Sequence, residues 1–264
     1  MLRFFLATII PHIEFTPSFA MMFVAIFGTT ISPYLFFWQA SEEAEEDVAK
    51  HKIKEIGEGR PDISKKEIMT MKKDVAAGML FSQLITWVIM ITTAGSLHIN
   101  GITDIQTADQ AAQALEPLVK AFPYSGELSK VIFALGIIGT GLLAIPVLAG
   151  SSAYALSETF GWKEGLGKKF GKAKPFYLVI ITSTIIGLGI ALSNTDPIQA
   201  LIYAAVINGI VAVPILFIIL KISNDKTILA NRTNGLFSRI VGWITFTFMA
   251  ISVIAFLILT WNQS

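Results

Sequence analysis

The chain has 264 residues, of which 53% are hydrophobic and only 15% are charged, and its mean hydropathy is +0.65. Globular domains carry about 25% charged residues, so this composition indicates a membrane protein. The lack of cysteine excludes a disulfide framework, a thiolate metal site and thiol catalysis, and a net charge of +1 gives no support for nucleic-acid binding.

The N-terminal segment, residues 1–10, is apolar and carries one basic residue, Arg3. It is too short to cross a bilayer and lacks the small-residue cleavage site of a signal peptide. Pro11 and Pro17 follow it. We therefore interpret residues 1–18 as the remnant of a preceding helix and an outer loop, and residues 19–264 as one transmembrane domain.

The first long apolar segment, residues 19–40, has a polar centre. It is long enough to span a bilayer, for which a helix needs about 20 residues. Its centre reads Gly28-Thr29-Thr30-Ile31-Ser32-Pro33-Tyr34. Pro33 has no backbone N–H and its ring clashes one turn back, so the helix is predicted to break just before it. Such breaks at membrane depth are where secondary transporters bind ions and solutes, although a proline kink repaired by neighbouring helices is the alternative interpretation.

Five further apolar runs predict five more spans. They lie near residues 75–97, 131–157, 176–193, 199–220 and 240–261. Pro197 suits the first turn of the helix that follows the short connection after residue 193. In the third span, glycines predict close helix packing. They are Gly139, Gly141 and Gly150.

The charges of the loops predict the orientation of the spans. Most of the 20 basic residues lie in three alternate loops, residues 41–74, 158–175 and 221–239. The intervening loops carry only Lys120 and Lys130. By the positive-inside rule the three basic loops are cytoplasmic, which makes the chain a multi-pass protein of the cytoplasmic membrane.

Two stretches resemble the Nramp family of divalent-metal transporters. The run from Gly28 to Tyr34, followed by Gln39 and Ser41, resembles the family's sixth-helix motif, Gly-Ala-Thr-Val-Met-Pro-His-Asn. A second run resembles the family's eighth helix: Phe133-Ala134-Leu135-Gly136-Ile137-Ile138-Gly139-Thr140-Gly141, continuing to Leu148-Ala149-Gly150. The resemblance covers almost the whole chain and implies an all-α, LeuT-type bundle that is partial, corresponding to helices six to eleven.

The resemblance also implies a metal site at the break. The family takes a backbone carbonyl and a methionine sulfur from this helix, and these positions fall on Thr29 and Ser32. Gly28, Thr30, Pro33 and Tyr34 support the break. The family's Asp-Pro-Gly-Asn motif is not in this sequence, so we expect the chain to carry half of the site and to act with an N-terminal half that carries the first five helices.

Departures from the family pattern predict a change in selectivity. A thioether favours late transition metals, whereas a hydroxyl and carbonyls suit Mg²⁺ or Mn²⁺, so Ser32 predicts a harder ion than iron. Ser32 capping the half-helix that begins at Pro33 is the other interpretation, and both can hold. The two family histidines are replaced by Tyr34 and Gln39, which argues against a histidine proton relay through this half.

Polar residues elsewhere in the chain have two interpretations each. A carboxylate run that follows the broken helix could attract cations to its mouth, or form a solvated face paired with Lys50, Lys52 and Lys54. The run consists of Glu42, Glu43, Glu45, Glu46 and Asp47. Asn208 in the fifth span lies two residues from the position of a family glutamine near the metal, and helix–helix hydrogen bonding is its alternative role.

These features predict a secondary transporter of divalent cations, with Mn²⁺ or Mg²⁺ favoured over Fe²⁺, that works by alternating access. Transport of an amino acid or other organic solute on the same fold, or a non-transporting fragment or subunit, are the alternatives. The sequence has no Gly-x-Ser-x-Gly, His-Glu-x-x-His or Gly-Lys-Ser/Thr motif, so an enzyme is not expected. We expect no cofactor apart from the transported ion, and the bilayer, a divalent ion and the N-terminal half as partners.

Overall fold

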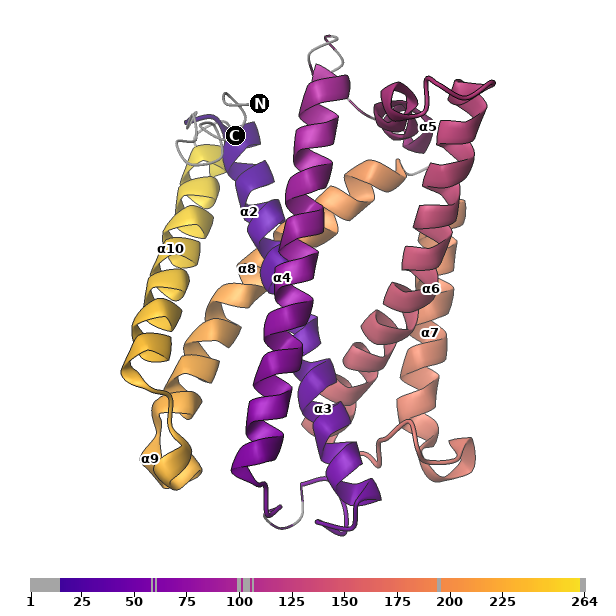
Figure 1. Ribbon diagram of the computed structural model, residues 1–264. Coiled ribbons are helices and arrows are strands. Elements are labelled where there is room, and N and C mark those ends of the chain that lie inside the picture. The colour runs from indigo at the N-terminus through magenta and orange to yellow at the C-terminus, as the bar shows by residue number, and fades with distance from the viewer. Residues whose placement is uncertain are drawn as a thin grey trace. The chain divides into compact units, whose positions relative to one another are not determined.

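The structure, a computed structural model, describes residues 15–57, 59, 61–98, 101, 105, 107–193 and 196–261. Within these ranges it consists of helices and their connections, without β-strands (Figure 1). Residues 1–14, and with them most of the segment interpreted as a helix remnant, lie outside the described part. The long helices are α2 (Pro17–Ile31), α3 (Pro33–Ala49), α4 (Lys65–Ser96), α6 (Ser125–Phe160), α7 (Lys174–Leu192), α8 (Pro197–Asn224) and α10 (Leu236–Trp261).

Six helical segments are long and apolar enough to cross a membrane, with α2 and α3 forming one of them. Each of the six predicted spans falls on one of these segments, but most of the helices are longer than predicted. The clearest case is α4, which begins at Lys65 instead of residue 75 because Ser64 and Glu67 form a capping box there. Hydropathy marks only the part of a helix that suits lipid, whereas caps and backbone hydrogen bonds decide where the helix ends.

Short helices connect the long ones. They are α5 (Ala108–Ala112), η2 (Gln113–Leu118), η3 (Phe170–Lys172), α9 (Lys226–Leu229) and η4 (Ala230–Arg232). The connection between α7 and α8 ends as the sequence predicts, with Pro197 as the first residue of α8. The Asp196 side chain accepts a hydrogen bond from the Ile198 N–H at 2.9 Å, which supports this helix start.

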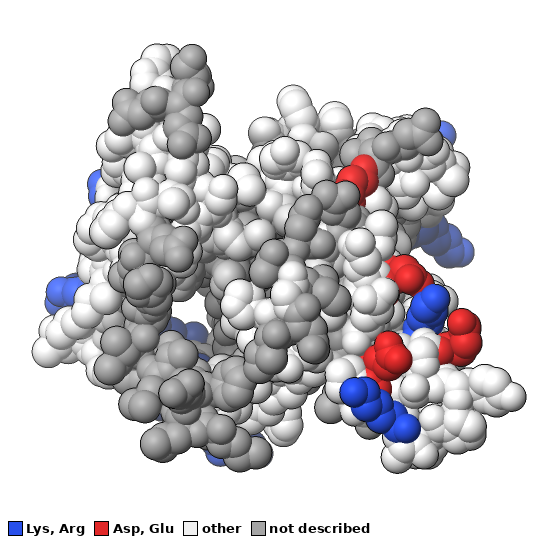
Figure 2. All heavy atoms as spheres, turned by 90° about the horizontal axis from the view of Figure 1, so that it is seen from above, with Lys and Arg blue, Asp and Glu red and all other residues white. Residues whose placement is uncertain are grey.

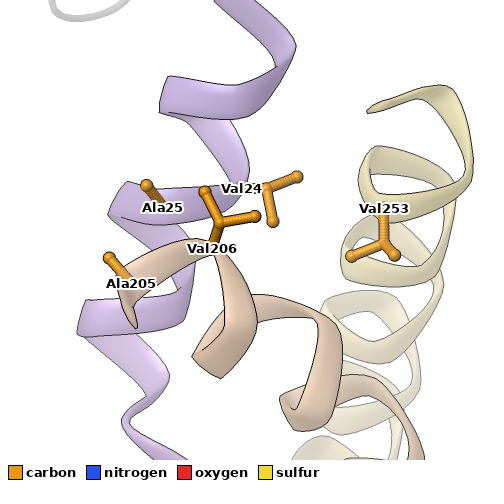
Figure 3. Packing of buried hydrophobic residues seen from close by; sticks show 5 residues of the cluster. All are labelled: Val24, Ala25, Ala205, Val206 and Val253. Carbon is orange, nitrogen blue, oxygen red and sulfur yellow. The ribbon is translucent and has the colours of Figure 1, made fainter. Parts of the chain in front are cut away.

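The chain divides into two compact units, one of residues 1–36 with 199–264 and the other of residues 37–198. In the first unit α2 packs along α10. The core contains small and β-branched side chains from α2, α8 and α10 (Figure 3). They are Val24, Ala25, Ala205, Val206 and Val253. The ring of Phe248 on α10 lies edge-on to the rings of Phe23 and Phe27, with centroids 5.7 and 5.3 Å apart.

Two glycines allow α2 and α8 to cross at backbone contact. A Cβ atom added to Gly28 would lie 2.5 Å from the Gly209 nitrogen and 2.8 Å from its Cα. A Cβ added to Gly209 would lie 2.6 Å from the Val24 carbonyl oxygen. Since these obstacles are backbone atoms, which cannot move aside, only glycine fits at either position. Gly28 of the polar motif is therefore required for packing.

In the second unit α6 and α7 pack side by side (Figure 1). Their contact is filled by a cluster of Ala153, Tyr154, Ala173 and Phe176, and Trp38 of α3 packs against it. A Cβ at Gly150 would meet the Trp38 ring, at 3.2 Å from Cε3, which confirms the predicted close packing there. The same prediction finds no support at Gly139 and Gly141, where an added Cβ meets no neighbouring helix among the described residues.

Ion pairs hold the ends of helices in the second unit. Lys52 contacts Glu67 at 2.6 Å and Asp47 at 3.3 Å, which joins the end of α3 to the start of α4. Lys130 of α6 contacts Asp109 of α5 at 3.1 Å. Figure 2 shows one face of the molecule on which uncharged residues dominate and acidic and basic atoms gather beside one another. Charges thus lie at helix ends, as a bilayer requires.

The glycine crossing yields the first prediction. Gly209→Ala should destabilise the protein by about 1–3 kcal/mol, because overpacking against a backbone forces the two helices apart. Gly139→Ala, a matched change in an α6 position with open space, should be neutral or slightly stabilising because alanine favours a helix more than glycine does. Thermal unfolding of the detergent-solubilised variants measures both, and equal melting temperatures for the two would contradict the assigned crossing.

Candidate functional site

The predicted break lies where the sequence placed it. Helix α2 ends at Ile31, Ser32 adopts the left-handed conformation (φ 46°, ψ 72°), and α3 begins at Pro33. The Ser32 N–H donates to the Gly28 carbonyl at 3.0 Å, which closes the last turn of α2. A non-glycine residue in this conformation is strained, and such strain persists only where the surroundings enforce it.

The two predicted metal ligands contact each other. The Ser32 hydroxyl donates a hydrogen bond to the Thr29 carbonyl oxygen. This carbonyl needs a donor because the residue four positions on is Pro33, which has no N–H. The predicted cap at the start of α3 is therefore wrong in detail: Ser32 caps the end of α2, because its left-handed backbone turns the hydroxyl back along that helix.

The threonines of the motif keep their hydroxyl lone pairs available. Thr29 Oγ1 donates to the Ile26 carbonyl at 2.9 Å, and Thr30 Oγ1 donates to the same carbonyl at 2.8 Å. A hydroxyl that donates its hydrogen in this way still has two acceptor lone pairs. Thr29 is exposed and Ser32 is only 4% exposed, so the oxygen cluster is open on the Thr29 side.

The remaining predicted residues lie at different distances from the break. Pro33 is buried at the break itself, and Tyr34 is half-buried beside it. Gln39 is exposed and lies six residues after Pro33 on α3, which corresponds to about 9 Å along the helix axis. Asn208 is half-buried and directly precedes Gly209, whose backbone contacts Gly28. Its side chain has no hydrogen-bond partner among the described residues, so the helix–helix bonding role finds no support there.

The break alone is an incomplete cation site. It offers one carbonyl and hydroxyl oxygens, all of them uncharged, whereas Mg²⁺ takes six oxygen ligands. Within the described ranges no group of three or more His, Cys, Asp or Glu residues is placed to hold a metal ion. A cation at the break would therefore need further ligands from water or from outside the described residues.

Sequence reasoning missed a second polar cluster, beyond the break on α3. Glu45 Oε1 accepts hydrogen bonds from the Tyr154 hydroxyl and from the Leu166 N–H (2.7 Å), and Oε2 accepts from the Gly167 N–H at 3.1 Å. Tyr154 is fully buried. Three hydrogen-bond donors therefore surround the Glu45 carboxylate. Nothing in the spacing of Glu45 could have indicated this, because its partners lie more than 100 residues away.

The other acidic residues of the run follow the solvated interpretation in part. Glu46 pairs with Lys50 at 2.7 Å and Asp47 with Lys52 at 3.3 Å, as predicted. Lys54 has no ion pair among the described residues. Glu45 departs from the lysine-paired interpretation, since its partners are an α6 tyrosine and backbone N–H groups instead of lysines.

Six apolar spans define an integral, multi-pass membrane protein. One of the spans is broken at a cluster of oxygen atoms, and secondary transporters bind their solutes at broken helices of this kind. The family described as "Natural resistance-associated macrophage protein-like" matches residues 3–259. The chain belongs to this family, Nramp.

Family membership confirms the predicted class of fold and the coarse function. Nramp proteins have the LeuT-type fold, they are transporters rather than enzymes, and they carry divalent metal ions. The all-helical structure with six candidate spans agrees with this fold.

The cluster on α3 gives the second prediction. Tyr154→Phe should destabilise the protein by about 1–3 kcal/mol, because the half-buried Glu45 carboxylate loses the donor that the buried Tyr154 supplies. Tyr203→Phe is the matched control, since Tyr203 is 58% exposed and its hydroxyl has no partner among the described residues. Melting temperatures of the two variants compare them, and a Tyr154→Phe protein as stable as Tyr203→Phe would refute the contact.

Proposed function

We propose that this chain moves a hard divalent cation, Mn²⁺ or Mg²⁺ in preference to Fe²⁺, with the Thr29 carbonyl and the Ser32 hydroxyl as ligands. The observation that carries the proposal is the contact between these two oxygens at the break. When a cation binds, the Ser32 hydroxyl keeps its hydrogen but rotates it away from the Thr29 carbonyl. Both oxygens then direct lone pairs to the ion.

The chemistry of the two oxygens supports the selectivity. Carbonyl and hydroxyl oxygens suit Mg²⁺ and Mn²⁺, whereas the sulfur expected from the family pattern suits softer ions. The remaining ligands would come from an N-terminal half with the first five helices, and from water. With Tyr34 and Gln39 in place of the family histidines, proton coupling would run through acidic groups of that half.

The charge pattern supports an orientation in the cytoplasmic membrane. Residues 41–74, 158–175 and 221–239, which comprise three loops and the helix ends that adjoin them, contain most of the basic residues. By the positive-inside rule these loops face the cytoplasm. The C-terminal part of α3, which carries the acidic residues, would then lie at the cytoplasmic end of the pathway. Alternating access would expose the break to each side of the membrane in turn.

The selectivity of Ser32 is the third prediction. In cells that express the full transporter, Ser32→Met should raise uptake of Cd²⁺ and Fe²⁺ relative to Mn²⁺ by about tenfold, because sulfur binds softer ions better. Ser32→Ala should lower Mn²⁺ and Mg²⁺ uptake by at least about tenfold, the effect of losing one ligand worth roughly 1.4 kcal/mol. Uptake of the isotopes, measured at equal protein levels, provides both values.

Ser252→Ala is the matched control, because Ser252 also donates its hydroxyl to a carbonyl of its own helix, at 2.8 Å, but lies in α10. Its uptake should equal that of the unaltered protein. Unchanged Mn²⁺ and Mg²⁺ uptake in both Ser32 variants would refute the site. Competition by amino acids, with none by divalent ions, would instead support an organic solute as the substrate.

A further inference from the structure

The loop between α6 and α7 wraps around the carboxylate of Glu45. The Leu166 and Gly167 N–H groups point at this carboxylate, at 2.7 and 3.1 Å. Gly165 has φ +129°, and a Cβ added there would lie 3.0 Å from Glu45 Oε1. The positive φ and the close approach both require glycine at this position. The loop is therefore shaped to fit the end of α3.

One carboxyl group in this loop is buried without a partner. Glu164 is 6% exposed, and its Oε2 atom has no hydrogen-bond partner within the described structure. The Ser157 hydroxyl on α6 is fully buried and equally without a partner. Glu164 lines a cavity of about 310 Å³ together with Glu45, Lys54, Glu55 and Lys168. A buried carboxylate that lacks donors is costly, whereas a protonated carboxyl group supplies its own donor.

The charges around Glu164 favour its neutral form. Glu158 from α6 and Glu45 from α3 are the acidic neighbours, and Lys168 of the loop is the basic one. Glu55 and Lys54, from the segment after α3, face the same cavity with opposite charges. Burial is the main cause that raises the pKa of Glu164 to about 7, the repulsion of Glu158 adds to it, and Lys168 opposes it.

We propose that the Glu164 carboxyl group is a proton-binding site, and that the bound proton holds the loop of residues 161–169 against the end of α3. When the proton leaves, a third carboxylate charge appears beside Glu45 and Glu158, and the loop opens to let water reach it. The loop contacts the half-helix that starts at the break, so proton binding here changes how firmly that half-helix is held to α6. This role does not depend on which ion the break carries.

The direction of the pH effect follows from linkage. In the open loop Glu164 has its ordinary pKa of 4.5, and in the closed loop its pKa is about 7. The proton's contribution to the free energy of loop closure is therefore full below pH 4.5 and decreases as the pH rises to about 7. Above that pH the free energy of closure no longer changes with the protonation of Glu164.

Hydrogen–deuterium exchange of the whole chain in nanodiscs is the test. After correction for intrinsic rates, protection of the peptide that covers residues 161–169 should fall by at least about tenfold from pH 5 to pH 7.5. The peptide with α9, whose N-cap Asp225 has a pKa held below 3.8 by its bonds to Thr227, should show no change and is the internal reference. If the protection of the 161–169 peptide in the unaltered protein were the same at pH 5 and pH 7.5, this measurement alone would overturn the proposal.

Two variants separate Glu164 from its surroundings. Glu164→Gln, neutral at every pH, should keep the high protection and reduce its pH dependence to less than about twofold. Glu55→Gln removes an exposed carboxylate from the same cavity and should keep the full pH dependence. A Glu164→Gln protein with the pH dependence of the unaltered protein, or a Glu55→Gln protein without it, would assign the effect to another group and overturn the proposal.

Discussion

The contact on which the helix break depends is the crossing of α2 and α8 at Gly28 and Gly209. Gly28 lets the backbone of α8 approach, and its carbonyl accepts the Ser32 N–H that closes the last turn of α2. Gly28 thus holds the last turn of α2 against α8. Pro33 then prevents the helix from continuing in register, because it has no N–H for the Thr29 carbonyl. The break is therefore fixed from both directions, by packing before it and by covalent geometry after it.

The same geometry joins the structural role of Ser32 to its proposed functional role. Its hydroxyl satisfies a carbonyl that the proline leaves without a donor, and that carbonyl is the other proposed ligand. A cation at this place offers both oxygens a positive charge in exchange for one hydrogen bond of about 1 kcal/mol. Under the proposed function, capping and ligation would be successive states of one pair of atoms. Methionine at this position would leave the carbonyl without this donor in the ion-free state, so the serine changes the stability of the break as well as the choice of ion.

The sequence predicted those features that are local in the chain or set by lipid. Apolar length indicated the six spans, Pro33 indicated the break, and Pro197 indicated the start of α8. It could not predict the partners of Gly28, Glu45 or Glu164, because these contacts join residues that are distant in the chain. The third-span glycines show the same limit. A Cβ added to Gly150 would meet Trp38, whereas one added to Gly139 meets nothing among the described residues, although both glycines lie in apolar sequence of one helix. Likewise, the acidic run after the break looks uniform in the sequence, yet only Glu45 is enclosed by hydrogen-bond donors.

The broken helix lies at one of the two places where the chain passes from one compact unit to the other. The chain passes from one unit to the other between residues 36 and 37 and again between residues 198 and 199. Both passages lie within one turn of a proline that begins a helix, Pro33 in the first case and Pro197 in the second. Alternating access requires one group of helices to move against another around a fixed site. A helix interrupted at Ser32 can follow such a motion by changing a few backbone angles, whereas an unbroken helix would have to bend. Gly28 anchors α2 to α8 in the first unit, and Trp38 and Glu45 anchor α3 to α6 in the second. The oxygens proposed to bind the ion therefore lie at the residues whose backbone angles such a motion would change, so occupancy of the proposed site would be coupled to the conformation of the break.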